Sequence, residues 1–154
     1  MSMIEQSVEV NVPLSTAYNQ WTQFEEFPSF MEGVKEVRQI DATHLHWVAE
    51  VGGHRQEWDA EVTEQRPDER IAWKNVGGKQ NAGVVTFHRL DDQHTRLMVQ
   101  LDFMPEGLIE KLGDALAAPD RQVAGDLQRF KEMIESRARE SGAWRGEVRR
   151  VDEP

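Results

Sequence analysis

The hydrophobic and polar positions divide the chain into three parts, and the first part predicts one strand followed by two short helices. Residues 4–12 alternate, with Glu9 and Asn11 facing opposite to the valines at positions 8, 10 and 12, which is typical of a half-buried strand that ends before Pro13. Two segments with short helical spacing follow, "TAYNQWTQF" and "FPSFMEG", the second closed by Gly33. Trp21 and Phe24 belong to the buried stripe of the first.

From Val34 to Phe103 the hydrophobic pattern has a period of two, which predicts a run of consecutive strands. Turns that contain Asp, Gly or Pro separate them. We expect six strands at about 34–41, 43–51, 54–65, 69–76, 82–90 and 95–104. Consecutive strands with tight turns predict an antiparallel meander.

The loop Gly52-Gly53 predicts a tight hairpin and sets its register. On one face this register pairs Val51 with His54, Ala49 with Gln56, Trp47 with Trp58, and Leu45 with Ala60. On the other face it pairs Glu50 with Arg55, His46 with Asp59, and His44 with Glu61. One face is therefore aromatic and apolar and the other carries complementary charges, and a slip by one residue would bury those charges.

The last part of the chain predicts a long helix and a disordered tail. Apolar residues recur with a 3.6-residue period at Ile109, Leu112, Leu116, Val123, Leu127, Phe130 and Ile134. Pro119 should kink or split this helix. Residues 141–154 lack periodicity, so we expect one domain over 1–140 and a disordered tail. Trp144 and the arginines at positions 145, 149 and 150 are either a docking segment for an acidic partner or a mobile end.

Composition restricts the function further. The chain has 154 residues, no cysteine and a net charge of -10, so thiolate catalysis and Cys-based metal sites are excluded and nucleic acid is an unfavourable partner. No apolar run approaches the roughly 20 residues that a membrane span needs, and acidic residues stand near the start where a signal peptide would be basic. We therefore expect a cytoplasmic protein without an integral membrane segment.

These elements predict an α+β fold, with a curved seven-stranded antiparallel sheet around the long C-terminal helix and two short helices after the first strand. A helix covers a strip only about 10 Å wide, so it leaves part of the concave face of the sheet uncovered. Bulky side chains fill the remaining space, or an internal cavity occupies it.

The order of elements resembles the START/Bet v 1-like superfamily, and within it the polyketide cyclase/dehydrase and coenzyme Q-binding type. The resemblance covers about residues 3–138 and rests on "VEVNVPLSTAYNQWTQFEEFPSFMEGVKEVRQID", "VTFHRLDDQHTRLMVQLDFMPEG" and "DLQRFKEMIE". It implies a helix-grip fold with a hydrophobic cavity between sheet and long helix. Members of this superfamily carry lipids, quinones, hormones or polyketides, and a minority catalyse cyclisation or aromatisation in the cavity. A fold alone does not choose among these functions.

Our main hypothesis is a protein that binds, transports or senses a small hydrophobic molecule, with no cofactor and no assigned protein partner. Candidate ligand-binding residues are those with inward parity and the apolar stripe of the long helix: Trp47, His54, Gln56, Trp58, Trp73, Asn75, Phe87, Leu101, Phe103, Leu112, Leu116 and Val123. The tryptophans either form an aromatic wall for a ligand or fill the concave face. His54 either meets a ligand at the rim or is solvated; Gln56 lies deeper and, if buried, needs a hydrogen-bond partner.

Two further interpretations concern enzymes and metals. A polyketide aromatase/cyclase would need an acid or base in the cavity, and only His54, Gln56, Asn75 and Arg89 have suitable parity, so we assign no catalytic residue. A bulge near Arg89 would turn that side chain outward. His44 and His46 with Asp59 and Glu61 form a metal-like set, but on the charged face they are explained as ion pairs, and we assign no metal site. An interaction protein with a plugged cavity is the last alternative.

Overall fold

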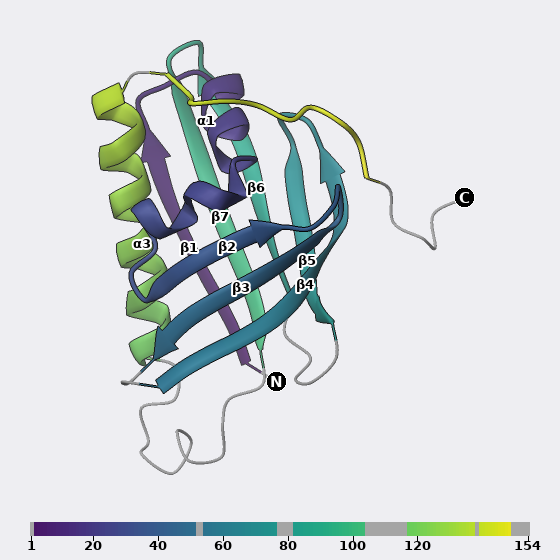
Figure 1. The fold of residues 1–154 in the computed structure, drawn as a ribbon. Coiled ribbons are helices and arrows are strands. Elements are labelled where there is room, and N and C mark those ends of the chain that lie inside the picture. Colours follow the sequence, from purple (N-terminus) through teal and green to yellow (C-terminus); the bar gives the residue numbers. More distant parts are fainter. Residues whose placement is uncertain (1, 52–53, 77–81, 104–116, 138, 149–154) are drawn as a thin grey trace.

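The computed structural model describes residues 2–51, 54–76, 82–103, 117–137 and 139–148 (Figure 1). Strand β1 is followed by helix α1, the 3-10 helix η1, six further strands and helix α3. Their bounds are β1 Ser2–Val10, α1 Leu14–Trp21, η1 Phe24–Ser29, β2 Val34–Gln39, β3 His44–Val51, β4 His54–Arg66, β5 Arg70–Val76, β6 Ala82–Asp91, β7 His94–Phe103 and α3 Ala117–Arg137. The predicted helix-grip order of elements is confirmed.

All strands belong to one antiparallel sheet in the order β1-β7-β6-β5-β4-β3-β2. The meander from β2 to β7 follows from its short turns, and β1 joins the far side of β7. The β3–β4 register is the predicted one throughout, from Val51 opposite His54 to His44 opposite Glu61. The predicted register is therefore confirmed at every pair named.

Helix α3 is described from Ala117 to Arg137, so Pro119 lies near the start of its described part. Residues 104–116, which include Ile109, Leu112 and Leu116 of the predicted apolar stripe, lie outside the described part. The kink or break that we expect at Pro119 therefore stays a prediction.

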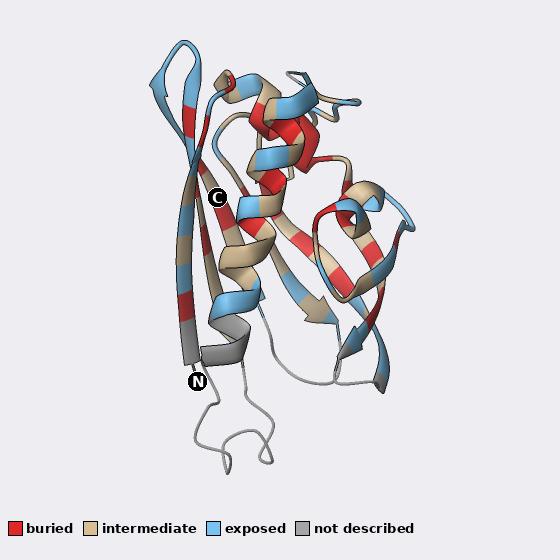
Figure 2. Cartoon of the chain, turned by 90° about the vertical axis from the view of Figure 1, so that its left-hand side faces the viewer, coloured by how far each residue is buried: buried red, intermediate tan, exposed pale blue. Residues whose placement is uncertain are grey.

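Aromatic side chains join α3 to the first two helices. Phe130 of α3 packs edge-on against Trp21 of α1, with ring centroids 5.1 Å apart, and against Phe30 just after η1, at 5.2 Å. Phe130 and Ile134 are fully buried, and Leu127 is nearly so. The predicted apolar stripe of this helix therefore does face the core, where α3, α1 and the sheet meet (Figure 2).

Two β-bulges change which way side chains point. The register of β4 against β5 shifts between Val62 and Glu64, and that of β6 against β7 shifts between Arg89 and Asp91. Arg89 lies before the second shift, opposite Thr95, so this bulge does not turn it; its side chain is nevertheless exposed and pairs with Asp92. After the first shift Gln65 lies opposite Ile71, and both are buried.

The C-terminal segment, residues 139–148, runs beside α1, although no periodic pattern in the sequence predicts order there (Figure 1, yellow). Its backbone N–H groups at Ser141 and Trp144 donate to Gln20 Oε1 and Thr22 Oγ1 at 2.8 and 3.0 Å. Val148 then pairs with Gln65 through two backbone hydrogen bonds of 2.8 and 2.9 Å. We expected disorder from residue 141; residues 141–148 are instead held by specific hydrogen bonds, and residues 149–154 lie outside the described part.

No helix in the described ranges is long and apolar enough to cross a membrane.

Candidate functional site

A cavity lies between the first two helices and the strands β3, β4 and β5. It has an empty volume of about 390 Å³, part of which is open to solvent. Its lining is formed by α1 and η1 on one side and by the inward positions of the three strands on the other: Trp21, Phe24, Phe27, Met31, Leu45, Trp47, Ala60, Val62, Ile71 and Trp73. Every one of these side chains is apolar or aromatic.

The helical side of the cavity follows from the spacing of three phenylalanines. Phe24, Phe27 and Phe30 are three residues apart, and in a 3-10 helix side chains at this spacing lie above one another on one face. Phe27 packs against Phe24 and Phe30, with both centroid distances 5.5 Å. Phe24 and Phe27 therefore form an aromatic wall of the cavity, while Phe30 packs against Phe130 of α3.

The strand side is dominated by tryptophans from neighbouring strands. Trp47 stacks on Trp58, with ring centroids 5.8 Å apart and planes 9° from parallel, and Trp47 also packs against Phe27 at 5.6 Å. The aromatic contacts thus run across the cavity from β4 to η1. Trp58 is half-buried and does not line the cavity, so its contribution there is indirect, through its stacking on Trp47.

Trp73 reaches the cavity because its neighbour on β6 is glycine. Gly83 lies opposite Trp73 on β5 and Leu101 on β7. A Cβ at Gly83 would lie 2.6 Å from Trp73 Cζ2 and 2.7 Å from Leu101 Cδ2, so any larger residue would collide with both side chains. The absence of a side chain at Gly83 therefore makes room for the indole.

Of the predicted ligand-binding residues, Trp47 and Trp73 line this cavity. Phe87 is buried elsewhere, edge-on to Tyr18, while Leu101 and Val123 pack against the core and Asn75 is half-buried. The Gln56 side chain is exposed, so it has no desolvation to offset and needs no partner in the protein. The side chains of His54 and Phe103, together with Leu112 and Leu116, lie outside the described part.

Sequence reasoning missed most of the wall opposite the tryptophans. We predicted a cavity between the sheet and the long helix; in the cavity described above the helical side of the lining comes from α1, η1 and Met31, and no lining residue comes from the described part of α3. The three-residue spacing of the phenylalanines in "FEEFPSF" was the signal that would have found Phe27. Leu45, Ala60 and Val62 also line the cavity. Their parity placed them on the predicted apolar face, but they were not among the candidate ligand-binding residues.

The outer face of the same hairpin carries the predicted charges. His46 lies between two carboxylates, with Nδ1 2.8 Å from Asp59 Oδ1 and Nε2 2.9 Å from Glu57 Oε1. These two hydrogen bonds, the one to Asp59 first, raise the pKa of His46. Both ring nitrogens of His46 therefore already have carboxylate partners.

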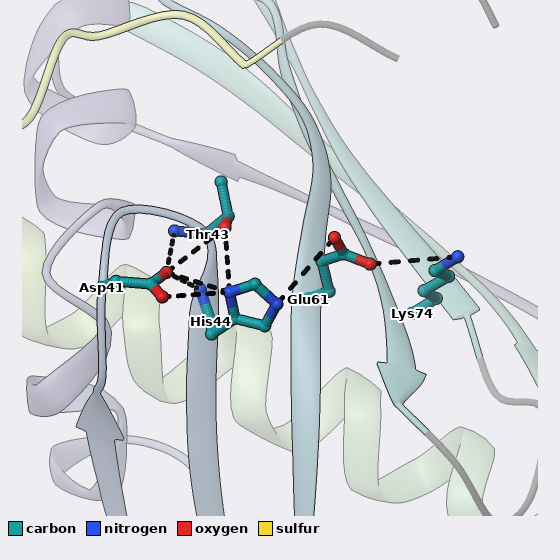
Figure 3. A network of polar contacts seen from close by, with 5 residues as sticks. All are labelled: Asp41, Thr43, His44, Glu61 and Lys74. Atoms are coloured by element: carbon teal, nitrogen blue, oxygen red, sulfur yellow. Dashed lines mark hydrogen bonds and ion pairs between the residues drawn. The ribbon is translucent and has the colours of Figure 1, made fainter. Parts of the chain in front are cut away.

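A second outer network surrounds His44 (Figure 3). Its Nδ1 lies 3.0 Å from Asp41 Oδ1, and its Nε2 lies 3.9 Å from Glu61 Oε2. The other carboxylate oxygen of Glu61, Oε1, lies 3.9 Å from Lys74 Nζ. The hydrogen bond from the Thr43 backbone N–H, then that from His44, lowers the pKa of Asp41 to about 2. The two histidines thus have separate partners, and within the described residues no group of three or more His, Asp or Glu side chains is arranged to hold a metal ion.

The described lining of the cavity offers no acid or base. Its ten residues include no Asp, Glu, His, Lys, Arg or Tyr. Its one buried polar group without a partner among the described residues is the indole N–H of Trp47. The described wall can therefore bind an apolar molecule, but it supplies no group that could transfer a proton in a reaction.

Comparisons with known proteins agree with this fold. Residues 10–132 match the model of a family described as polyketide cyclase / dehydrase and lipid transport. An uncharacterized 17.2 kDa protein from Streptomyces lincolnensis is 58% identical over 149 residues, which cover 96% of this chain and 99% of that protein.

Solved structures share the fold at low sequence identity. The Zhui aromatase/cyclase from Streptomyces sp. R1128 has a TM-score of 0.73 at 17% identity, covering 93% of this chain and 99% of that one. A START superfamily protein from Mycobacterium smegmatis has a TM-score of 0.64 at 18% identity, covering 83% and 98%. The protein TTHA0849 from Thermus thermophilus has a TM-score of 0.73 at 20% identity, covering 88% and 99%.

Proposed function

Because the chain belongs to the polyketide cyclase/dehydrase and lipid transport family, we propose that it binds a small, neutral, apolar molecule in the cavity between η1 and strands β3–β5. The observation that carries this proposal is the lining itself, which combines aromatic and aliphatic walls with unfilled volume. We propose a role in carrying or sensing this molecule.

The charge of the ligand follows from the same lining. An ionised carboxylate or ammonium group loses its hydration on entering an apolar cavity and needs a paired charge or several hydrogen bonds in return. The described wall offers neither, apart from one indole N–H. Flat aromatic or quinone-like molecules therefore fit the proposal better than ionised fatty acids do.

We place the entrance beside Met31, Trp47 and Trp73. These three lining residues are half-buried, whereas the other seven are buried. Gly33, just beyond Met31, has a φ of 90° and its carbonyl accepts the backbone N–H of Glu50 at 2.7 Å. Opening of this loop is the gating movement that we propose, and hydrogen exchange would contradict it if the Glu50 amide were among the slowest to exchange.

Filling the cavity tests the proposal. Ala60 lies on the cavity wall and Ala82 is exposed on β6, so Ala60→Leu reduces the cavity while Ala82→Leu adds the same atoms outside it. Titration with naphthalene, followed by tryptophan fluorescence, should show binding to the wild type and to Ala82→Leu, and at least tenfold weaker binding to Ala60→Leu. Equal affinity for all three proteins would contradict binding in this cavity.

A cyclase function is the alternative that the family brings with it. We rank it second, since the described cavity wall lacks an acid or base. Conversion of an aromatic polyketide precursor by the purified protein, at a rate that falls in Ala60→Leu but not in Ala82→Leu, would reverse this order.

A further inference from the structure

Trp73 marks the limit of the cavity on the β6 side of the sheet. The strand side of the lining comes from β3, β4 and β5, and none of the described lining residues belongs to β6. Ile71 and Trp73 are the lining residues from β5, the last of these strands, and Trp73 is the larger of the two. The extent of the cavity toward β6 therefore depends on where the Trp73 indole lies.

The Trp73 indole lies against Gly83 of β6, its partner in the β5–β6 register. A Cβ at Gly83 would lie 2.6 Å from Cζ2 and 2.9 Å from Cε2 of the indole, closer than non-bonded carbon atoms approach one another. Among the described residues, Gly33 is the glycine with a positive φ, so the backbone conformation of Gly83 does not itself require glycine. A glycine inside a strand can also mark a close approach, and here the approaching group is the indole.

A side chain at position 83 would leave the indole one direction in which to move across the sheet. Leu101 of β7 also reaches the space above Gly83, since its Cδ2 lies 2.7 Å from the same Cβ position, and it blocks movement toward β7. On its other side Trp73 lies opposite Val62 of β4, which lines the cavity. An indole displaced from Gly83 would therefore lie over Val62, inside the cavity.

We propose that Gly83 sets the upper size limit of the ligand by holding the Trp73 indole at the edge of the cavity. This inference rests on the function proposed above and adds a size limit to the neutral, apolar ligand. Gly83 is not a lining residue, so it acts through Trp73 as a positioning residue. Because it controls the space in the cavity and not its polarity, a change at Gly83 should affect a large probe more than a small one.

Two apolar probes of different size test the proposal. Calorimetric titrations with benzene and naphthalene are compared for the wild type and Gly83→Ala. A displaced indole occupies space that the second ring of naphthalene needs. We therefore expect naphthalene to bind Gly83→Ala about tenfold more weakly than the wild type, and benzene to bind it less than about twofold more weakly. The ratio of the two affinities cancels the effects that both probes share.

A second substitution shows whether the effect passes through the indole. Trp73→Leu removes the ring that lies against Gly83 and keeps an apolar wall. In this background Gly83→Ala should leave the ratio of naphthalene to benzene affinity unchanged to within about twofold, because no indole remains to be displaced. A loss of naphthalene affinity that persists in full in the double variant would mean that Gly83 does not act through Trp73, and would overturn the proposal.

The other outcomes are distinguishable. If the preference for naphthalene over benzene is the same in the wild type and Gly83→Ala, the inference is overturned while the apolar cavity stands. If neither probe binds the wild type, the cavity proposal and this inference both fail. Thermal unfolding identifies a variant that does not fold. If Gly83→Ala does not fold, Trp73→Leu alone decides the question: removal of the indole should raise the preference for naphthalene, and an unchanged preference overturns the inference.

Discussion

The two faces of the β3–β4 hairpin contain residues from the same two strands, yet they contribute to the molecule in different ways. On the inner face Leu45 and Ala60 are buried, and Trp47 stacks on Trp58 beside the cavity. On the outer face His46 and its carboxylate partners remain in contact with water. Alternation specifies which residues share a face. The elements that pack over that face determine how much free energy each contact contributes to stability.

The magnitudes differ accordingly. Burying a large apolar side chain stabilises a fold by about 1.5–3 kcal/mol, whereas an exposed ion pair contributes about 0–1 kcal/mol and is weakened by salt. The inner face should therefore determine stability and binding, and the outer face should mainly add a dependence on pH. The following predictions test this difference, from the largest expected effect to the smallest.

Removing a buried inner side chain should have the largest effect. Ile71 is 1% exposed and lines the cavity, so Ile71→Ala should lower the free energy of unfolding by about 2–5 kcal/mol, as measured by denaturant titration. The matched control is Lys74→Ala on the outer face of the same strand, which should cost less than about 1 kcal/mol. Similar costs for both variants would contradict the assigned faces.

The contacts of the C-terminal segment should have an intermediate effect on stability, because they are polar but partly shielded from solvent. Arg145→Ala removes the 2.7 Å ion pair with Asp68 and the contact with the Tyr18 ring. We expect a loss of about 1 kcal/mol in unfolding free energy and faster hydrogen exchange at the Gln65 amide, which Val148 protects. Unchanged exchange would show that the segment does not hold β4.

The smallest effect should come from the outer face and depend on pH. The pKa of His46 is raised from 6.5, so its stabilising contribution is present below pH 6.5 and is lost as pH rises through the higher folded-state pKa. His46→Gln should therefore lower the melting temperature slightly between about pH 5 and 6.5, and hardly at all well above neutral pH. A difference that grows with rising pH would have the wrong sign for this pairing.

Much of the fold could be predicted because alternation and turn chemistry are local properties. The Gly52-Gly53 loop and the charges of Glu50 and Arg55 were enough to predict the register of β3 against β4. The bulge that turns Gln65 inward could not be predicted, since no glycine or proline stands between Val62 and Gln65 to mark it. The docking of the C-terminal segment depends on single hydrogen bonds to α1, which leave no periodic pattern.

The candidate site divides in the same way. Trp47 and Trp73 could be assigned to the inner face from parity alone, and both line the cavity. Phe27 and Met31 were not among the predicted ligand-binding residues, because their segment is short and resembles a turn. Their role in the cavity wall depends on the packing of η1 against distant strands. Gln56 shares the parity of Trp58 but is exposed, which parity cannot reveal.

The most direct test of the central claim is methyl NMR during a titration with naphthalene. Binding in the cavity predicts shifts for the methyl groups of Met31, Val62 and Ile71, which line it. The exposed methyl groups of Ile40, Val76 and Leu90 should stay unchanged. Shifts confined to these exposed residues, with Val62 and Ile71 unaffected, would contradict a ligand-binding cavity between η1 and the sheet.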